Sequence, residues 1–214
     1  MTRGVLYWNS GTKLLTRLHV SLGSLREIYD GPVTILLSNA PKRYEEILGT
    51  NGFNVKRIDV PEGHRQALII KTCLNQYTPY ETTVFIDCDT LIIRPFDELF
   101  GWAEEHKFVA TAFATWNVKR GAIARRVKSW YDQKLISEEE YKAAAAYPAG
   151  INVGIMGFQK DATIYNDWRP LAEKGFNAFI PDEVSCQILL PKHHHYLAPQ
   201  YFNSSCRYSP VDDN

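Results

Sequence analysis

The chain has 214 residues, of which 45% are hydrophobic and 22% are charged, a mixture typical of a globular domain with a sizeable core. Its 24 lysines and arginines balance its 24 aspartates and glutamates, so no overall electrostatic field favours a nucleic-acid partner or an acidic membrane surface. No stretch approaches about 18 consecutive apolar residues, and the N-terminus lacks a basic segment followed by an apolar run, so neither a membrane span nor secretion is expected.

The first half of the chain alternates between two hydrophobic periods, which predict strands and helices in turn. Strands are predicted over residues 5–8, 33–37, 53–60 and 83–86. Helices are predicted over residues 13–29, 41–48 and 65–76. Because strand, helix and strand repeat in this order, we expect a mostly parallel α/β sheet.

The second half is less regular and carries more helix. Helices are predicted over residues 95–102, 121–131, 137–146, 162–174 and 182–190, and strands over 108–113 and 151–158. Ser137 followed by Glu140 forms a capping box at the start of one of these helices. With no internal repeat and no linker, the whole chain is expected to be a single domain, Rossmann-like, with helices on both faces of its central sheet.

The cysteines indicate a reducing compartment. Cys73, Cys88, Cys186 and Cys206 form no CxxC pair and show no zinc-ligand spacing. A disulfide framework is uncommon in a chain of this length. We therefore expect free thiols and a cytoplasmic location.

Two carboxylates, Asp87 and Asp89, stand one residue apart at the end of the apolar strand 83–86. In an open parallel sheet this edge is where ligands bind. Two ionised carboxylates this close repel each other and favour a compensating cation, and oxygen ligands suit Mg²⁺ or Mn²⁺. Such an ion could neutralise a departing diphosphate; the plainer alternative is a solvated strand end.

A phosphatase of the haloacid dehalogenase type also matches this local pattern, with Asp87 as nucleophile and Asp89 as acid. That motif normally ends the first core strand, whereas three predicted strands precede it here, and no Gly-Asp-x-x-x-Asp motif follows. A nucleotidyltransferase would need a glycine-rich phosphate loop near the N-terminus, which is absent.

Residues 71–100, KTCLNQYTPYETTVFIDCDTLIIRPFDELF, resemble the core of the glycogenin-like retaining glycosyltransferases, which have the GT-A fold. The matching features are a helical lysine, a strand, the Asp-x-Asp-Thr motif and a closing Asp-x-Leu-Phe. The resemblance implies a UDP-sugar donor, Mn²⁺ or Mg²⁺ held by Asp87 and Asp89, donor contacts from Lys71 and Cys88, and retention at the anomeric carbon.

Further blocks follow in the family's order, and together the matches cover about two thirds of the chain. Residues 150–156 resemble a segment whose asparagine faces the donor sugar, which implies that Asn152 binds a sugar hydroxyl. Asp182 and Glu183 fall where the family has an Asp-Gln pair, and 197–203 resembles its Leu-Pro-x-x-Tyr-Asn segment. Asp182 is the candidate carboxylate near the anomeric carbon, or else a helix N-cap.

The remaining predicted donor contacts come from two earlier segments. By the same resemblance the loop Asn9, Ser10 and Gly11 approaches the base and ribose, with Gly11 permitting close backbone contact; a helix-capping turn is the alternative. Arg65, on the same predicted helix as Lys71, is a further candidate donor contact.

The basic segment 116–130 carries arginines and lysines beside aromatic residues. It could form a platform for the acceptor, a glycan or a protein-linked sugar. A solvated helix face explains the same pattern.

The chain also departs from the family. Glu183 replaces its glutamine, and the C-terminal His-x-x-Gly-x-Lys-Pro-Trp motif, which supplies a third metal ligand, is absent. Either the domain is cut from a longer protein, as in the algal-virus capsid-glycosylating proteins that it resembles, or its third ligand differs. A binding domain for sugar nucleotides or glycans that lost catalysis is the alternative from another class, and turnover distinguishes the two.

Overall fold

The computed structural model describes residues 1–113 and 122–203. In these residues one sheet has the strand order β3-β2-β1-β4-β6-β5-β7. Its strands are β1 (Arg3–Ser10), β2 (Val33–Ser38), β3 (Asn54–Arg57), β4 (Thr82–Ile86), β5 (Phe108–Phe113), β6 (Gly150–Gln159) and β7 (Tyr196–Ala198). β6 runs antiparallel to β4 and β5, and the other paired strands are parallel. The predicted mostly parallel sheet is confirmed.

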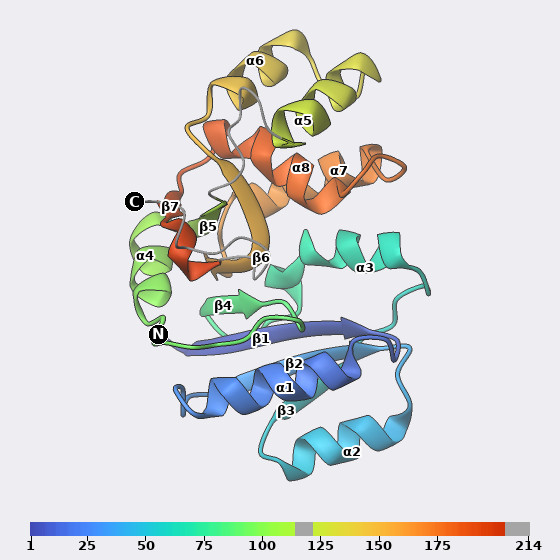
Figure 1. Ribbon diagram of the computed structural model, residues 1–214, viewed down its shortest axis with the longest axis vertical. Helices are drawn as coiled ribbons and strands as arrows, with labels where there is room; N and C mark the ends of the chain where they lie inside the picture. Colours follow the sequence, from blue (N-terminus) through green and yellow to red (C-terminus); the bar gives the residue numbers. More distant parts are fainter. Residues whose placement is uncertain (114–121, 204–214) are drawn as a thin grey trace.

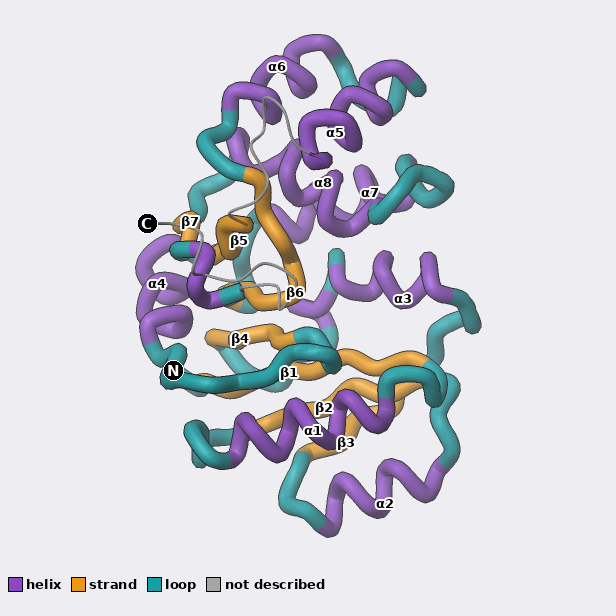
Figure 2. Tube along the Cα trace, viewed as in Figure 1, coloured by secondary structure: helices purple, strands orange, loops and turns teal. Residues whose placement is uncertain are grey.

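Helices cover both faces of this sheet, as Figures 1 and 2 show. They are α1 (Leu15–Arg26), α2 (Lys42–Thr50), α3 (His64–Lys71), α4 (Glu98–His106), α5 (Ala122–Asp132), α6 (Glu138–Ala146), α7 (Ile164–Lys174) and α8 (Pro181–Leu189). One apolar cluster packs α1, α2 and α4 against the sheet, and another packs α3, α7 and α8 against its other face. α5 and α6 pack on α8 in a smaller cluster, at the end of the molecule away from β1, β2 and β3 (Figure 1).

Most predicted elements are present, with shifted ends. The capping box is confirmed, because Ser137 Oγ accepts from the Glu140 amide at 3.2 Å and Glu140 Oε2 accepts from the Ser137 amide at 2.8 Å. The helix predicted over 65–76 ends at Lys71 and is followed by a short 3₁₀ helix, Leu74–Gln76. The strand Tyr196–Ala198 was not predicted, because three residues are too few to show a period.

Pairing in the sheet brings distant segments to one edge. β1 and β4 are parallel neighbours, so their carboxyl ends meet at the same edge. β6 pairs antiparallel with β4, with Ile155 opposite Ile86, so Gly154 lies beside Asp87. The amide of Asp87 donates to the Gly154 carbonyl at 2.7 Å, which ties the loop after β4 to β6.

Two further predictions concern the state of the cysteines and the absence of a membrane-spanning helix. Cys73, Cys88 and Cys186 are buried free thiols, as expected; Cys206 lies outside these residues. Within 1–113 and 122–203, no helix is both long enough and apolar enough to cross a bilayer.

Candidate active site

Asp87 and Asp89 line a cavity of about 870 Å³ at the carboxyl end of β4. Asn152 and Gly154 of β6 and Asn203 line the same cavity. The structure thus brings together three residues that the sequence predicts for one site, Asp87, Asp89 and Asn152. The volume lies within the range of pockets that hold small molecules and cofactors.

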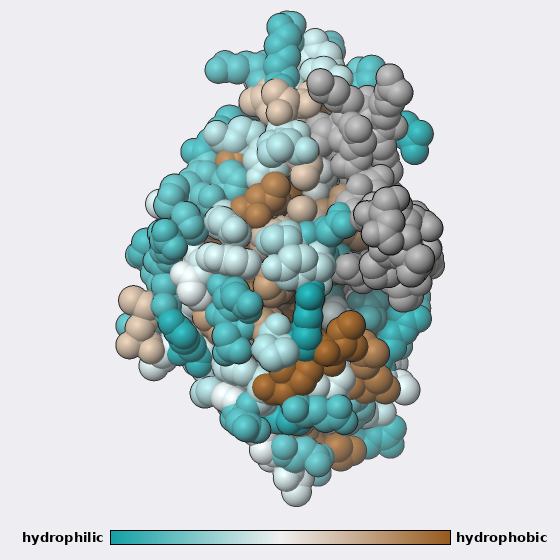
Figure 3. Space-filling view, turned by 60° about the vertical axis from the view of Figure 1, so that its left-hand side comes forward, coloured by the Kyte–Doolittle hydropathy of each residue, from teal (hydrophilic) through white to brown (hydrophobic). Residues whose placement is uncertain are grey.

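Much of the lining of this cavity is apolar. It includes Leu91 and Ile93 in the loop after β4, which are 60% and 78% exposed. Figure 3, in which the left-hand side of Figure 1 is turned toward the viewer, shows a group of strongly hydrophobic residues at the surface. The lining of the cavity therefore combines polar side chains with apolar ones, some of which lie in the exposed loop after β4.

Lys71, at the C-terminal end of α3, is bound to Asp87. Its Nζ lies 2.7 Å from both carboxylate oxygens of Asp87 and 3.9 Å from Asp182 Oδ2. Burial would lower the pKa of Lys71, but Asp87 and Asp182 raise it above its ordinary value. The ammonium is therefore charged and neutralises one of the two carboxylates; a direct donor contact by Lys71 stays a prediction.

Asp182 lies in the first turn of α8 and is 1% exposed. Within the described residues its Oδ1 is buried without a hydrogen-bond partner. Burial raises its pKa, the opposing effect of Lys71 lowers it, and Asp87 raises it further. Asp182 does not cap the helix with its side chain, because the N-cap residue is Ile180 and no side-chain cap bond is present there.

Glu183, the next residue, links two parts of the site. Its Oε2 accepts from Asn152 Nδ2 at 2.9 Å, and its Oε1 accepts from Arg126 Nη1 of α5 at 2.7 Å. The amide oxygen of Asn152 in turn accepts from the Gly154 amide and from Asn203 Nδ2, both at 2.7 Å. Asn152 is therefore held on both sides of its amide group.

The burial of Glu183 makes stability depend on pH. Burial and then the nearby Asp182 raise the pKa of Glu183 from 4.5 to about 8, against the opposing effect of Arg126. Between these values the folded state binds more protons than the unfolded chain. The free energy of unfolding should therefore fall as pH rises, by at most about 1.4 kcal/mol per pH unit for this group. Urea unfolding at pH 5 and pH 8 should show a steeper fall in the wild type than in Glu183→Gln, and equal falls would contradict this assignment.

Two other predicted donor contacts, Cys88 and Arg65, lie apart from the cavity lining. Cys88 is 2% exposed and its Sγ donates to the Trp8 carbonyl at 3.1 Å, so this thiol points into the core. Burial raises its pKa, which keeps it protonated. Arg65 Nη1 donates to Asn177 Oδ1 at 2.8 Å. These side chains have structural partners, and their donor contacts stay predictions.

The loop after β1 has the backbone geometry that its glycine suggests. Gly11 has a φ of +74°, which favours glycine, and its missing Cβ would meet no atom within 4 Å. Asn9 is buried and donates from Nδ2 to the Gly11 carbonyl at 2.9 Å. Ser10 Oγ accepts from Ser38 Oγ at 3.0 Å. The loop lies at the same sheet edge as Asp87, so the predicted contact with base and ribose is compatible with its position.

The backbone at Gly154 lies close to two polar oxygens of the cavity lining. A Cβ at Gly154 would lie 2.7 Å from Asn152 Oδ1 and 3.0 Å from Asp87 Oδ2, so these oxygens leave no room for a larger residue at this position. The carboxylate of Asp89 is about half exposed and meets Arg17 at a long 3.4 Å, which leaves it available. Over residues 1–113 and 122–203, no group of three or more His, Cys, Asp or Glu could hold a metal. Donor oxygens or water would have to complete the coordination shell.

The sequence analysis did not predict the contacts that three residues make in this site. Asn203 and Gly154 lie in segments that resemble the family, but nothing in the pattern assigns them a contact. Arg126 belongs to the basic segment 116–130, of which residues 116–121 lie outside the described residues. Its role becomes visible in the structure, because its partner Glu183 is 57 positions away.

No family model and no curated protein matches the chain, but solved structures do. The glycosyltransferase GlyE of Streptococcus pneumoniae TIGR4 aligns with 95% of this chain at 13% identity and a TM-score of 0.63, although the chain spans 46% of GlyE. The galactosyltransferase LgtC, solved with donor and acceptor sugar analogs, aligns with 92% at 13% identity and a TM-score of 0.58, over 72% of LgtC.

A third similar structure carries ligands of interest. Glucosyl-3-phosphoglycerate synthase of Mycobacterium tuberculosis, in complex with Mn²⁺, UDP and phosphoglyceric acid, aligns with 99% of this chain at 16% identity and a TM-score of 0.50, over 72% of its own length. At these identities the likeness establishes the fold, which is that of GT-A type glycosyltransferases. Function has to be argued from the site.

Proposed function

We propose that this chain is a metal-dependent glycosyltransferase that moves a hexose from a UDP-sugar to a glycan or protein-linked acceptor, with retention at the anomeric carbon. The observation that carries the proposal is the meeting of Asp87, Asp89 and Asn152 at one cavity at the carboxyl end of β4. The shared fold supports it, as does a similar enzyme solved with Mn²⁺ and UDP. UDP and retention rest on the glycogenin-like motifs.

Asp87 and Asp89 would hold the metal ion, with donor oxygens or water as further ligands. When bound, the ion would act as a Lewis acid that neutralises the leaving diphosphate. The protein contributes the fixed position of Asp87, whose backbone amide donates a hydrogen bond to the Gly154 carbonyl. Preorganised groups of this kind need no rearrangement during the reaction.

Asn152 and Asp182 are the residues proposed to act on the sugar. Asn152 uses one N–H of Nδ2 for Glu183, which leaves the other to donate to a sugar oxygen in the cavity. Asp182 is buried beside Lys71, with its Oδ2 3.9 Å from Nζ, and it is not among the residues that line the cavity. A carboxylate there could stabilise positive charge that develops on the sugar ring, as carboxylates do in glycoside chemistry.

Calorimetric titration of UDP with and without Mn²⁺, followed by a panel of UDP-sugars, tests this function. We expect Mn²⁺-dependent binding of UDP. Absence of binding in both conditions would overturn the proposal and direct attention to phosphatase assays on phosphorylated sugars. Binding of UDP-sugars with neither transfer nor hydrolysis would identify a binding domain instead, and an inverted anomeric product by NMR would contradict retention.

A further inference from the structure

The amide of Asn152 has one rotational state that satisfies its neighbours. Its Oδ1 accepts from the Gly154 amide and from Asn203 Nδ2, and its Nδ2 donates to Glu183 Oε2. A rotation of the amide by 180° would set its NH₂ against two donors and its oxygen against a carboxylate. The direction of the free N–H therefore depends on Glu183 staying in place.

Glu183 is itself held by Arg126. The Arg126 guanidinium donates to Oε1 at 2.7 Å, and the side chains of the pair are 17% and 5% exposed. Both carboxylate oxygens accept hydrogen bonds, the pattern of the ionised form. A buried carboxylate needs such a partner, because removing one member of a buried ion pair is strongly destabilising.

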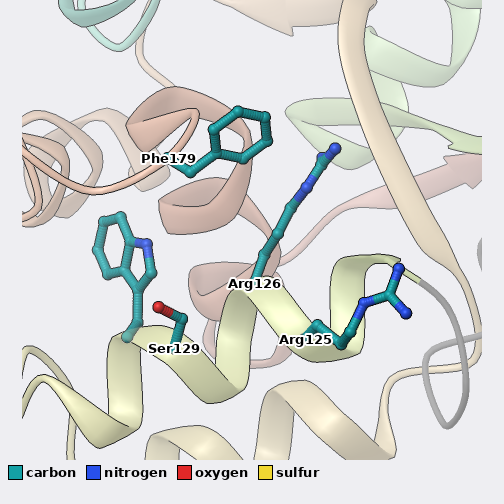
Figure 4. A pocket seen from close by; sticks show the side chains of 5 residues that line it. Arg125, Arg126, Ser129 and Phe179 are labelled. Carbon is teal, nitrogen blue, oxygen red and sulfur yellow. The ribbon is translucent and has the colours of Figure 1, made fainter.

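Arg125, the neighbour of Arg126 on α5, provides a matched control substitution. Figure 4 shows Arg126 extending from α5 toward Phe179, while Arg125 leaves the same helix in another direction. The Arg126 guanidinium also lies over the Phe179 ring, 4.9 Å from its centre. Arg125 is exposed, so replacing it changes the same charge on the same helix without removing the bond to Glu183.

We propose that Arg126 is a positioning residue, which acts through Glu183 to fix the Asn152 amide so that its free N–H points to the sugar of the donor. The sugar contact rests on the proposed function, whereas the fixing of the amide does not. A bidentate carboxylate is required here, because a glutamine at 183 could accept from Asn152 but would turn its own NH₂ toward Arg126.

The first arm of the test is the side-chain amide resonance of Asn152 in ¹⁵N-labelled protein at pH 8.5, above the raised pKa of Glu183. In Arg126→Met we expect this resonance to shift or broaden, whereas Arg125→Met should leave it unchanged. Arg126→Lys, which keeps a cation within reach of Glu183, should restore it in part. The remaining amide resonances report whether each variant is folded. An unchanged Asn152 resonance in a folded Arg126→Met would overturn the proposal.

The second arm measures the affinity for UDP, UDP-glucose and UDP-galactose in the presence of Mn²⁺. Arg126→Met should bind UDP with the same affinity as the wild type. Its affinity for the UDP-sugar that the wild type binds more tightly should fall by about tenfold, which is the effect of losing one hydrogen bond. If neither UDP-sugar binds the wild type more tightly than UDP does, the sugar contact is wrong. If UDP itself does not bind, the proposed function fails, while the first arm still decides the positioning role.

Discussion

Replacing Asp89 with asparagine is expected to reduce glycosyl transfer by about 100-fold or more while leaving the fold intact. Asp89 is about half exposed at the end of β4, and its ionic contact with Arg17 is long, at 3.4 Å, so little stability depends on it. Its carboxylate is one of the two proposed protein ligands of the metal. The loss corresponds to about 3 kcal/mol of the stabilisation that a metal gives to a leaving group.

Initial rates with saturating Mn²⁺ and the best UDP-sugar of the panel would measure this effect, with thermal unfolding as the check on folding. Asp161→Asn is the matched control, because Asp161 is an exposed aspartate that forms a surface ion pair with Lys107. That variant should keep wild-type activity. Wild-type activity in Asp89→Asn would remove the metal role of this residue.

Replacing Lys71 with methionine is expected to destabilise the metal-free protein by about 3 kcal/mol, the lower end of the cost of breaking a buried ion pair. The change leaves Asp87 and Asp182 together without the ammonium that lies 2.7 and 3.9 Å from them. Since it also removes a cation that competes for Asp87, it should raise the affinity for Mn²⁺. Mn²⁺ should then recover more stability in the variant than in the wild type.

Urea unfolding with and without Mn²⁺ would measure both effects. For the measurement without metal, Arg17→Met provides the control, because the Arg17–Asp89 pair is exposed and its loss should change the free energy of unfolding by less than about 1 kcal/mol. Equal stability of wild type and Lys71→Met without metal, together with equal stabilisation by Mn²⁺, would show that Lys71 does not compensate Asp87.

The sequence by itself determined the local elements and the position of the two carboxylates. Periodic apolar residues were sufficient to predict the helices and the longer strands, because one face of each element packs on the core. Asp87 and Asp89 could be placed at a ligand-binding edge because they follow an apolar strand of a parallel sheet. The capping box at Ser137 and Glu140 depends on a spacing of three residues, so it too could be predicted.

Tertiary structure alone decided which of these groups touch. The antiparallel register of β4 and β6 sets Gly154 beside Asp87, and no local pattern encodes a contact between residues that are 67 positions apart (154 − 87 = 67). Packing of α3 against the sheet directs Lys71 at Asp87, and packing of α5 on α8 pairs Arg126 with Glu183. These contacts arise from how whole elements pack, and a charge or hydrogen bond between distant residues leaves no period in the sequence.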